Sequence, residues 1–295
     1  MKKYFKLLRV EQWVKNLFVF VPLFFSGNIT NLDLLSKSIF AFIIFSLAAS
    51  VVYILNDYND IEADRKHPEK RRRPLASGAI SKSQAIGILI GLVITDIALI
   101  FLTQIYFHQN LWKFAAVIGV YFFMNLAYTF KLKHVAIIDI FIIAIGFVLR
   151  VLAGGYITGI TISRWAILLT FVLALVLAIG KRRGELINAQ VSGKTRKALD
   201  GYNVQFADIA LSISVTLAIV CYLMFTLSPE VQLRFHQRVF YTVIFVVFAF
   251  LRYLQQTLVY NRTESPTKIV YRDRYIQVTL LLWVAAFLIQ IYFKK

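Results

Sequence analysis

One short segment carries acidic side chains at a spacing that could bind a metal. Five of the 15 Asp and Glu residues fall between positions 57 and 69. An α-helix turns about 100° per residue, so residues three or four apart lie on the same face. With Asn56 set at zero, that face holds Asp60 at ~40°, Tyr53 at ~60°, Asp64 at ~80° and Asp57 at ~100°, whereas Glu62 falls opposite at ~240°.

The side chains of this face suit a hard cation bound together with phosphate. Carboxylate and amide oxygens are ligands for Mg²⁺, which takes one or two carboxylates and fills its other positions with water and substrate phosphate. Residues 66–74 follow directly and are rich in Lys and Arg, which bind phosphate oxygens. The pattern therefore favours a diphosphate site, although an acidic patch neutralised by the basic run is the alternative.

The elements that position this segment are apolar helices. The 295 residues are 59% hydrophobic and 16% charged, and the mean hydropathy is +0.69, which excludes soluble globular and disordered classes. A bilayer span needs ~20 mostly apolar residues. We predict an all-α integral membrane protein with nine transmembrane helices, at 16–30, 34–55, 84–106, 111–130, 135–157, 163–180, 206–228, 237–260 and 275–293.

Charge sets the expected orientation. Most of the 33 Lys and Arg fall in alternate loops, which places the N-terminus in the cytoplasm and the C-terminus outside, in a cell (inner) membrane. The net charge of +18 is thereby explained without nucleic acid as a partner. The first nine residues predict an interfacial helix, and the lone Cys221 predicts no disulfide or cysteine-based metal site.

The expected organisation is a single transmembrane domain over 1–295. The two long, charged inner loops, 57–83 and 181–205, are expected to cap a site that faces the cytoplasm. The sequence leaves the oligomeric state open, and a homo-oligomer is compatible with it.

The acidic motif resembles the first aspartate-rich motif of the UbiA superfamily of intramembrane prenyltransferases, whose members are nine-helix proteins. Further stretches resemble one branch of that superfamily, the decaprenyl-phosphate phosphoribosyltransferases. They reach from the start of the chain to about residue 202 and lie at 12–16, 70–78, 132–139, 149–155 and 180–186.

The resemblance implies a Mg²⁺-dependent membrane transferase of cell envelope biosynthesis. A 5-phosphoribosyl group would pass from 5-phosphoribosyl 1-diphosphate to a polyprenyl (decaprenyl-type) phosphate, with release of diphosphate. The implied catalytic residues are Asp60, Asn56, Asp64 and Asp57, of which Asn56, Asp60 and Asp64 would hold the metal. The implied substrate-binding residues are Lys15, Tyr53, Lys70, Arg73, Lys133, Arg150, Lys181, Arg182 and Glu185.

Two other function classes remain open at this point. Aromatic prenyltransferases of the superfamily carry a second aspartate-rich motif, whereas the loop 181–205 offers only Glu185 and Asp200 against six Lys and Arg. That basic loop suits the additional phosphates of a phosphoribosyl donor and a lipid phosphate. A transporter is less consistent, because it would carry polar residues and broken helices near mid-membrane.

Two residues keep two interpretations each. Arg150 lies within a predicted span, where a charge needs a partner or a cavity. It is expected either to contact a substrate phosphate or to form a buried pair with Asp96, at a similar depth in the third span. Tyr53 either donates a hydrogen bond to phosphate or packs against its neighbours.

Overall fold

The structure is a computed structural model that describes residues 2–192, 197–235, 237–262, 269 and 272–292. The described residues form helices and loops and contain no strand. The chain divides into two compact units, each described separately here. The first comprises Met1–Leu132 and Leu149–Thr161, and the second comprises Lys133–Val148 and Ile162–Lys295.

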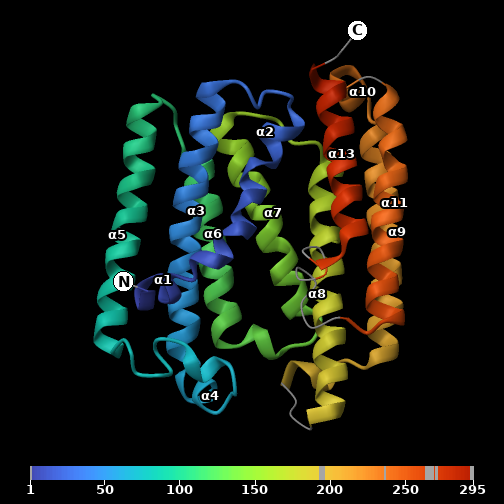
Figure 1. Ribbon diagram of the computed structural model, residues 1–295. Helices are drawn as coiled ribbons and strands as arrows, with labels where there is room; N and C mark the ends of the chain where they lie inside the picture. The colour runs from blue at the N-terminus through green and yellow to red at the C-terminus, as the bar shows by residue number, and fades with distance from the viewer. Residues whose placement is uncertain (1, 193–196, 236, 263–268, 270–271, 293–295) are drawn as a thin grey trace. The chain divides into compact units, whose positions relative to one another are not determined.

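The first unit begins with short helices and continues with long ones (Figure 1). In chain order they are α1 (Lys2–Leu8), the 3-10 helix η1 (Val10–Phe20), α2 (Val21–Phe25), α3 (Leu32–Asn59), α4 (Ile61–Arg65), η2 (Lys70–Arg72), α5 (Lys82–Tyr106) and α6 (Trp112–Phe130). The first residue of the short η3 (Leu132–His134) and the second half of α7 (Ile138–Thr158) complete this unit.

Helix α3 is the central element of the first unit and contacts α1, η1, α5 and α6. Asn31 caps its N-terminus, because its side-chain oxygen accepts hydrogen bonds from the backbone N–H of Asp33 (3.0 Å) and Leu34 (3.2 Å). Buried side chains along α3, such as Phe45, pack with α6 and α7 residues into one apolar core. The acidic motif therefore lies at the C-terminal end of a helix that is fixed on several sides.

Helix α5 is positioned by a capping box and is exposed along most of its length. The Ser81 side chain accepts from the Gln84 N–H, and the Gln84 side chain accepts from the Ser81 N–H. Large apolar side chains remain exposed beyond it, including Ile94 (62%) and Phe101 (61%). Such a surface is stable only in an apolar solvent, which fits a helix that faces lipid.

The second unit is built on two helix pairs, α8 with α9 and α11 with α13. Buried residues of α8 and α9 pack with Tyr253 into its main core. Its elements are the first half of α7, α8 (Arg164–Ser192), η4 (Lys197–Gly201), α9 (Val204–Leu227), α10 (Pro229–Phe235), η5 (Gln237–Thr242), α11 (Val243–Leu254), the π-helix η6 (Gln255–Val259) and α13 (Arg274–Tyr292).

Within the described residues, seven helices are long and apolar enough to cross a membrane, so the predicted count of nine is not confirmed. The described part of the C-terminal span 275–293 is a shorter apolar helix. The first predicted span, 16–30, is not one α-helix but η1 followed by the five-residue α2. Tertiary hydrogen bonds account for this, since Trp13 donates to Ser50 (3.1 Å) and Asn16 donates to Ser46 (2.9 Å) on α3.

The boundary predicted at residue 180 is also wrong. Helix α8 continues twelve residues further, to Ser192, so the first part of the predicted loop 181–205 is helical. Residues 193–196 of that loop lie outside the described residues. The charges at its start made the segment look like a loop, but Arg182 and Arg183 are buried on the helix and paired with carboxylates.

Gly154 lets η1 lie directly against α7 within the first unit. A Cβ at this position would lie 1.9 Å from the carbonyl oxygen of Val19, far inside van der Waals contact. Only glycine allows this approach. The contact holds η1, and with it Lys15 and Asn16, against the core.

Candidate functional site

The acidic motif continues as a helix across the junction of α3 and α4. The N–H of Asp60 donates to the carbonyl of Asn56 (3.0 Å), and the N–H of Asp64 donates to that of Asp60 (2.8 Å). This spacing keeps the residues of the predicted face in line. Asp57 and Asp64 are buried, and Tyr53, Asn56 and Asp60 are half-buried.

The opposite side of the motif is exposed, as expected. Glu62 forms an ion pair with Arg65 (3.0 Å) in which both side chains are largely exposed. Asn59, also exposed, donates from its side chain to the Asp60 carboxylate (3.3 Å). The interpretation of Glu62 as a solvated, ion-paired charge is therefore confirmed.

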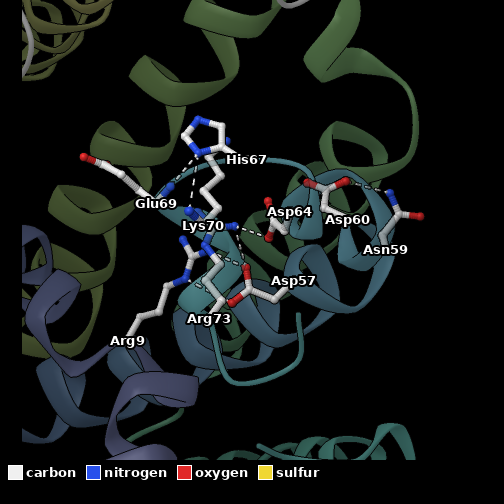
Figure 2. A network of polar contacts seen from close by, with 9 residues as sticks. All are labelled: Arg9, Asp57, Asn59, Asp60, Asp64, His67, Glu69, Lys70 and Arg73. Atoms are coloured by element: carbon white, nitrogen blue, oxygen red, sulfur yellow. Dashed lines mark hydrogen bonds and ion pairs between the residues drawn. The ribbon is translucent and has the colours of Figure 1, made fainter. Parts of the chain in front are cut away.

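Two arginines converge on the buried carboxylates (Figure 2). Arg73 donates to Asp57 (3.0 Å) and to Asp64 (2.7 Å), so its guanidinium bridges the two acids. Arg9, from the junction of α1 and η1, donates to both carboxylate oxygens of Asp57 through Nε and Nη2. Asp57 is only 2% exposed. Such a carboxylate requires compensating charge, and the arginines supply it.

A cavity of about 390 Å³ opens beside this network. Its lining includes four cationic side chains, those of Lys6, Arg9, Arg72 and Arg73, and the buried Asp57. Glu11, Gln12, Glu69 and Pro74 complete the lining. A cavity with this composition is suited to an anion.

Of the predicted phosphate-binding residues, Lys70 lies in the turn next to the network. The ring nitrogen Nδ1 of His67 accepts from the N–H groups of Glu69 (3.2 Å) and Lys70 (3.3 Å), as Figure 2 shows. His67 thus stabilises the turn that carries Lys70 and Arg73. This agrees with its interpretation as a polar loop residue rather than a catalytic base.

Lys15 is half-buried on η1, outside the seven candidate spans. Burial, together with the positive charges of Arg150 and Arg9, lowers the pKa of its ammonium group to about 8. A cation destabilised in this way gains from a bound anion. Tyr53 lies under the Arg9 guanidinium, 5.1 Å from ring centroid to Cζ, so its ring packs against a cation.

Arg150 is buried in the first unit, with partners the sequence did not suggest. Its Nε donates to the side-chain oxygen of Asn16 (2.7 Å), and its Nη2 donates to the Tyr121 hydroxyl (3.2 Å). Its Cζ lies 4.9 Å from the centroid of the Phe45 ring. Among the described residues Arg150 and Asp96 form no ion pair, and Oδ1 of Asp96 has no hydrogen-bond partner. Of the two interpretations of Arg150, the pair with Asp96 is therefore wrong, and contact with a substrate phosphate stays a prediction.

The predicted residues of the second unit lie in a different environment. Arg182 (2% exposed) donates to the fully buried Asp139 (2.7 Å) and to Glu185. The Tyr202 hydroxyl donates to the other oxygen of Asp139 (2.8 Å). Burial, and then its bond to Asp139, raises the pKa of Tyr202, which keeps the hydroxyl protonated. Lys133 is buried, and Lys181 lies 3.9 Å from Glu185.

Arg9 and Tyr202 are among the polar residues that sequence reasoning missed. Arg9 looked like one of several positive charges in an interfacial helix, and nothing in its neighbourhood points to Asp57, 48 residues away. Tyr202 follows the basic loop and shows no motif. Only the tertiary contacts identify them.

The donor set of the acidic motif fits Mg²⁺ bound together with phosphate. Asn56 and Asp60 are half-buried at the end of α3, and Asp64 lies one turn further on. In the part of the chain that the structure describes, no three Asp, Glu, His or Cys side chains converge as a metal site by themselves. Mg²⁺ commonly has fewer protein carboxylates and takes substrate oxygens. Asp57 is engaged by two arginines and Asp64 by one, so Asn56 and Asp60, followed by Asp64, are the better ligand candidates.

The chain matches one family model, that of the UbiA prenyltransferase family, over residues 17–283. Similar proteins include the decaprenyl-phosphate phosphoribosyltransferase of Mycolicibacterium smegmatis, 34% identical over 98% of this chain and 92% of the relative. The enzyme of the same name from Mycobacterium tuberculosis is 35% identical over 95% of this chain and 91% of its own.

Solved structures share the fold at lower identity. A UbiA homologue from Archaeoglobus fulgidus bound to DMAPP and Mg²⁺ superposes with a TM-score of 0.68 at 18% identity, covering 98% of this chain and 99% of the other. A digeranylgeranylglyceryl phosphate synthase structure gives 0.67 at 19% identity, with 98% of each chain covered. At these identities the likeness establishes the fold.

Proposed function

Because the chain belongs to the UbiA prenyltransferase family, we propose that it transfers a 5-phosphoribosyl group from 5-phosphoribosyl 1-diphosphate to a polyprenyl phosphate. Diphosphate is the second product. The relatives named decaprenyl-phosphate phosphoribosyltransferase align over nearly the whole chain, and seven of its helices are apolar enough to cross a membrane. The protein is thus a multi-pass membrane transferase, and we propose that its acceptor is a decaprenyl-type phosphate.

The observation that carries the proposal is the guanidinium of Arg73 between Asp57 and Asp64. It places a fixed cation directly beside carboxylates that can bind a metal. A diphosphate needs both partners at once, because its oxygens bind Mg²⁺ and arginine side by side. A simple neutralised patch explains the ion pairs, but the cavity beside them keeps four cationic side chains against three carboxylates, a net positive lining.

In the reaction, the residues of the chain bind and orient the donor. Asn56, Asp60 and Asp64 would hold Mg²⁺, which supplies positive charge against the departing diphosphate. Arg73 and Lys70 bind phosphate oxygens, and Lys15 and Lys133 are the further predicted phosphate ligands. Asp57 positions the arginines.

The chemistry at the anomeric carbon needs no strong base. The bond from that carbon to the diphosphate oxygen breaks, and a bond to an oxygen of the polyprenyl phosphate forms. The attacking oxygen is already anionic, so no proton has to be removed. Consistent with this, the His67 ring accepts hydrogen bonds from its own turn.

The topology we propose keeps nine crossings, with residues 16–30 and α13 as the two beyond the seven long helices. The N-terminus and the site would face the cytoplasm of an inner membrane. A cysteine replacing exposed Ser77 should react with an impermeant reagent only from the cytoplasmic side, and one replacing Asn31 only from outside. Labelling of the Ser77 variant in intact cells would reverse the topology.

The competing function within the family is prenylation of an aromatic acceptor by a polyprenyl diphosphate. Purified protein with Mg²⁺ should incorporate label from phosphoribosyl diphosphate into lipid when polyprenyl phosphates are supplied. Label transferred from an isoprenyl diphosphate to an aromatic acid, with no phosphoribosyl lipid formed, would replace our proposal by the alternative. A panel of acceptor chain lengths in the same assay would test the decaprenyl type.

A further inference from the structure

We propose that the cavity lined by Lys6, Arg9, Arg72 and Arg73 binds a phosphate monoester, the 5-phosphate of the phosphoribosyl donor. Arg9 and Arg72, which the sequence did not assign, become substrate-binding residues, and Asp57 becomes the positioning residue that holds Arg9 and Arg73. The inference rests on the proposed function. It adds a subsite that separates this donor from a prenyl diphosphate, which has no such group.

The convergence of two arginines on one carboxylate is the first argument. Arg9 and Arg73 come from segments 64 positions apart and meet at Asp57, which is almost fully buried. Each guanidinium has five N–H donors, and the two oxygens of Asp57, which the two arginines share, cannot accept all of them. Both arginines line the cavity, so their charge is pre-organised for an anion that enters it.

The backbone of Arg9 is the second argument. Its φ of 50° and ψ of 48° are left-handed, a conformation that non-glycine residues rarely adopt. Such strain persists where surrounding contacts hold it, and it is concentrated at binding sites. Here the contacts are the ion pair with Asp57 and the stacking on Tyr53. The strained turn aims Arg9 at the cavity instead of leaving it in solvent with Lys2 and Lys3.

The chemistry of the lining decides between two sources of a phosphate monoester. The polyprenyl phosphate acceptor also ends in such a group, but its chain requires adjoining apolar surface. Apart from Pro74, the lining consists of charged or amide side chains, in which four cationic groups exceed the three carboxylates of Glu11, Asp57 and Glu69. A ribose phosphate, with its hydroxyls, matches this surface better than a lipid chain.

The arginines of the second unit are less suited to this task. Arg182 is paired with Asp139 and Glu185. Arg183 donates to Asp208 and to the Thr257 carbonyl (2.7 Å). Both side chains are buried. A ligand phosphate would therefore have to break hydrogen bonds and ion pairs that hold helices together. The extra phosphate expected at the loop 181–205 is better accommodated in the first unit.

The test compares inhibitors that carry or lack the 5-phosphate. Arg9→Gln and Arg72→Gln are the test variants, and Lys82→Gln is the control, since it removes one exposed charge outside the cavity. We expect Arg9→Gln to raise KM for phosphoribosyl diphosphate and Ki for ribose 5-phosphate about 10- to 100-fold, and Arg72→Gln about threefold. Ki for magnesium diphosphate and KM for polyprenyl phosphate should change less than about twofold, and the control should match wild type.

Two outcomes would overturn the assignment. An equal loss for ribose 5-phosphate and diphosphate would place Arg9 at the diphosphate, and a change confined to KM of the lipid would place the acceptor phosphate in the cavity. Folding is checked by the Tm of each variant in detergent, with Arg9→Lys as a second variant that keeps the charge.

Binding of ribose 5-phosphate to the purified proteins by calorimetry, without turnover, separates this inference from the proposed function. Arg9-dependent binding in a protein that makes no phosphoribosyl lipid would keep the subsite and reject the proposed reaction. Normal phosphoribosyl transfer, together with unchanged ribose 5-phosphate binding in both test variants, would keep the proposed reaction and reject the subsite.

Discussion

The acid–base clusters of the two units have similar side chains and opposite surroundings. In the first unit, Arg73 joins Asp57 and Asp64 and is 25% exposed at the edge of a cavity. In the second, Arg182 joins Asp139 and Glu185 and is 2% exposed. A partly exposed arginine can exchange its carboxylate partner for a ligand. A buried arginine cannot, because the separation would leave an uncompensated charge in the interior.

This difference shows how to interpret basic segments in a membrane protein. Both segments follow an apolar helix, and both fit the positive-inside pattern. Whether a cation binds substrate or fixes helices depends on whether it lines accessible space. We therefore expect substitutions in the Asp57–Asp64–Arg73 cluster to change turnover and those in the Asp139–Arg182–Glu185 cluster to change stability.

The largest effect should come from Asp60→Ala. Loss of a central metal ligand should lower turnover by about 10³-fold or more, while Tm in detergent stays near that of wild type because Asp60 is only half-buried. Glu62→Ala, on the exposed side, should retain near-normal turnover. Equal losses in the two variants would contradict the helical-face argument.

Arg182→Leu should act on stability. It leaves the buried Asp139 without its cation, which we expect to cost about 3–5 kcal/mol of unfolding free energy. Lys181→Gln, one residue earlier and exposed, should cost less than about 0.5 kcal/mol. Thermal and denaturant unfolding in detergent measure both. If Arg182→Leu kept its stability but lost donor binding, the contrast between the units would fail.

Arg150 sharpens the comparison, because it belongs to the first unit yet is buried like Arg182. Arg150→Leu should remove the donor to the side-chain oxygen of Asn16 and to the Tyr121 hydroxyl, at about 1–3 kcal/mol, and slow the reaction. The double variant with Asp96→Leu should recover neither stability nor turnover, since Arg150 and Asp96 form no pair. The effects of the two substitutions should add. Recovery of stability and turnover in the double variant would show that a pair does form in the membrane.

The smallest effect concerns pH and Lys15. Because its pKa is lowered to about 8, the protonated fraction falls about tenfold between pH 7 and 9, and donor affinity should fall with it. Lys15→Arg should remove this dependence. Stability should move the other way and rise with pH between the folded value and the normal 10.5, since the unfolded chain binds more protons there. A KM for the donor that is flat from pH 7 to 9 in wild type would exclude Lys15 as a phosphate ligand.

Much of the fold and the central motif could be predicted from local pattern. Apolar length predicted nine spans, and seven helices of the described residues are long and apolar enough to cross a membrane. The 3.6-residue period correctly separated Asp57, Asp60 and Asp64 from Glu62. Both features depend on residues close together in the chain. The predicted count of nine spans is not confirmed. Hydropathy does not reveal that the span predicted at 16–30 is a 3-10 segment followed by a short helix.

The partners of the charged residues could not be predicted this way. Spacing suggested Asp96 for Arg150, but the structure supplies Asn16, 134 positions away. Likewise nothing local links Arg9 to Asp57 or Tyr202 to Asp139. These contacts depend on which helices pack together and at what height.

By itself, the sequence determined that this chain is a helical membrane protein with a carboxylate face followed by a basic run, since hydropathy and helical period are local properties. The tertiary structure decided which cations meet those carboxylates and which are buried elsewhere. The physical reason is that a charge in a low-dielectric interior must have a partner, and that partner can come from any segment the fold brings within about 3 Å.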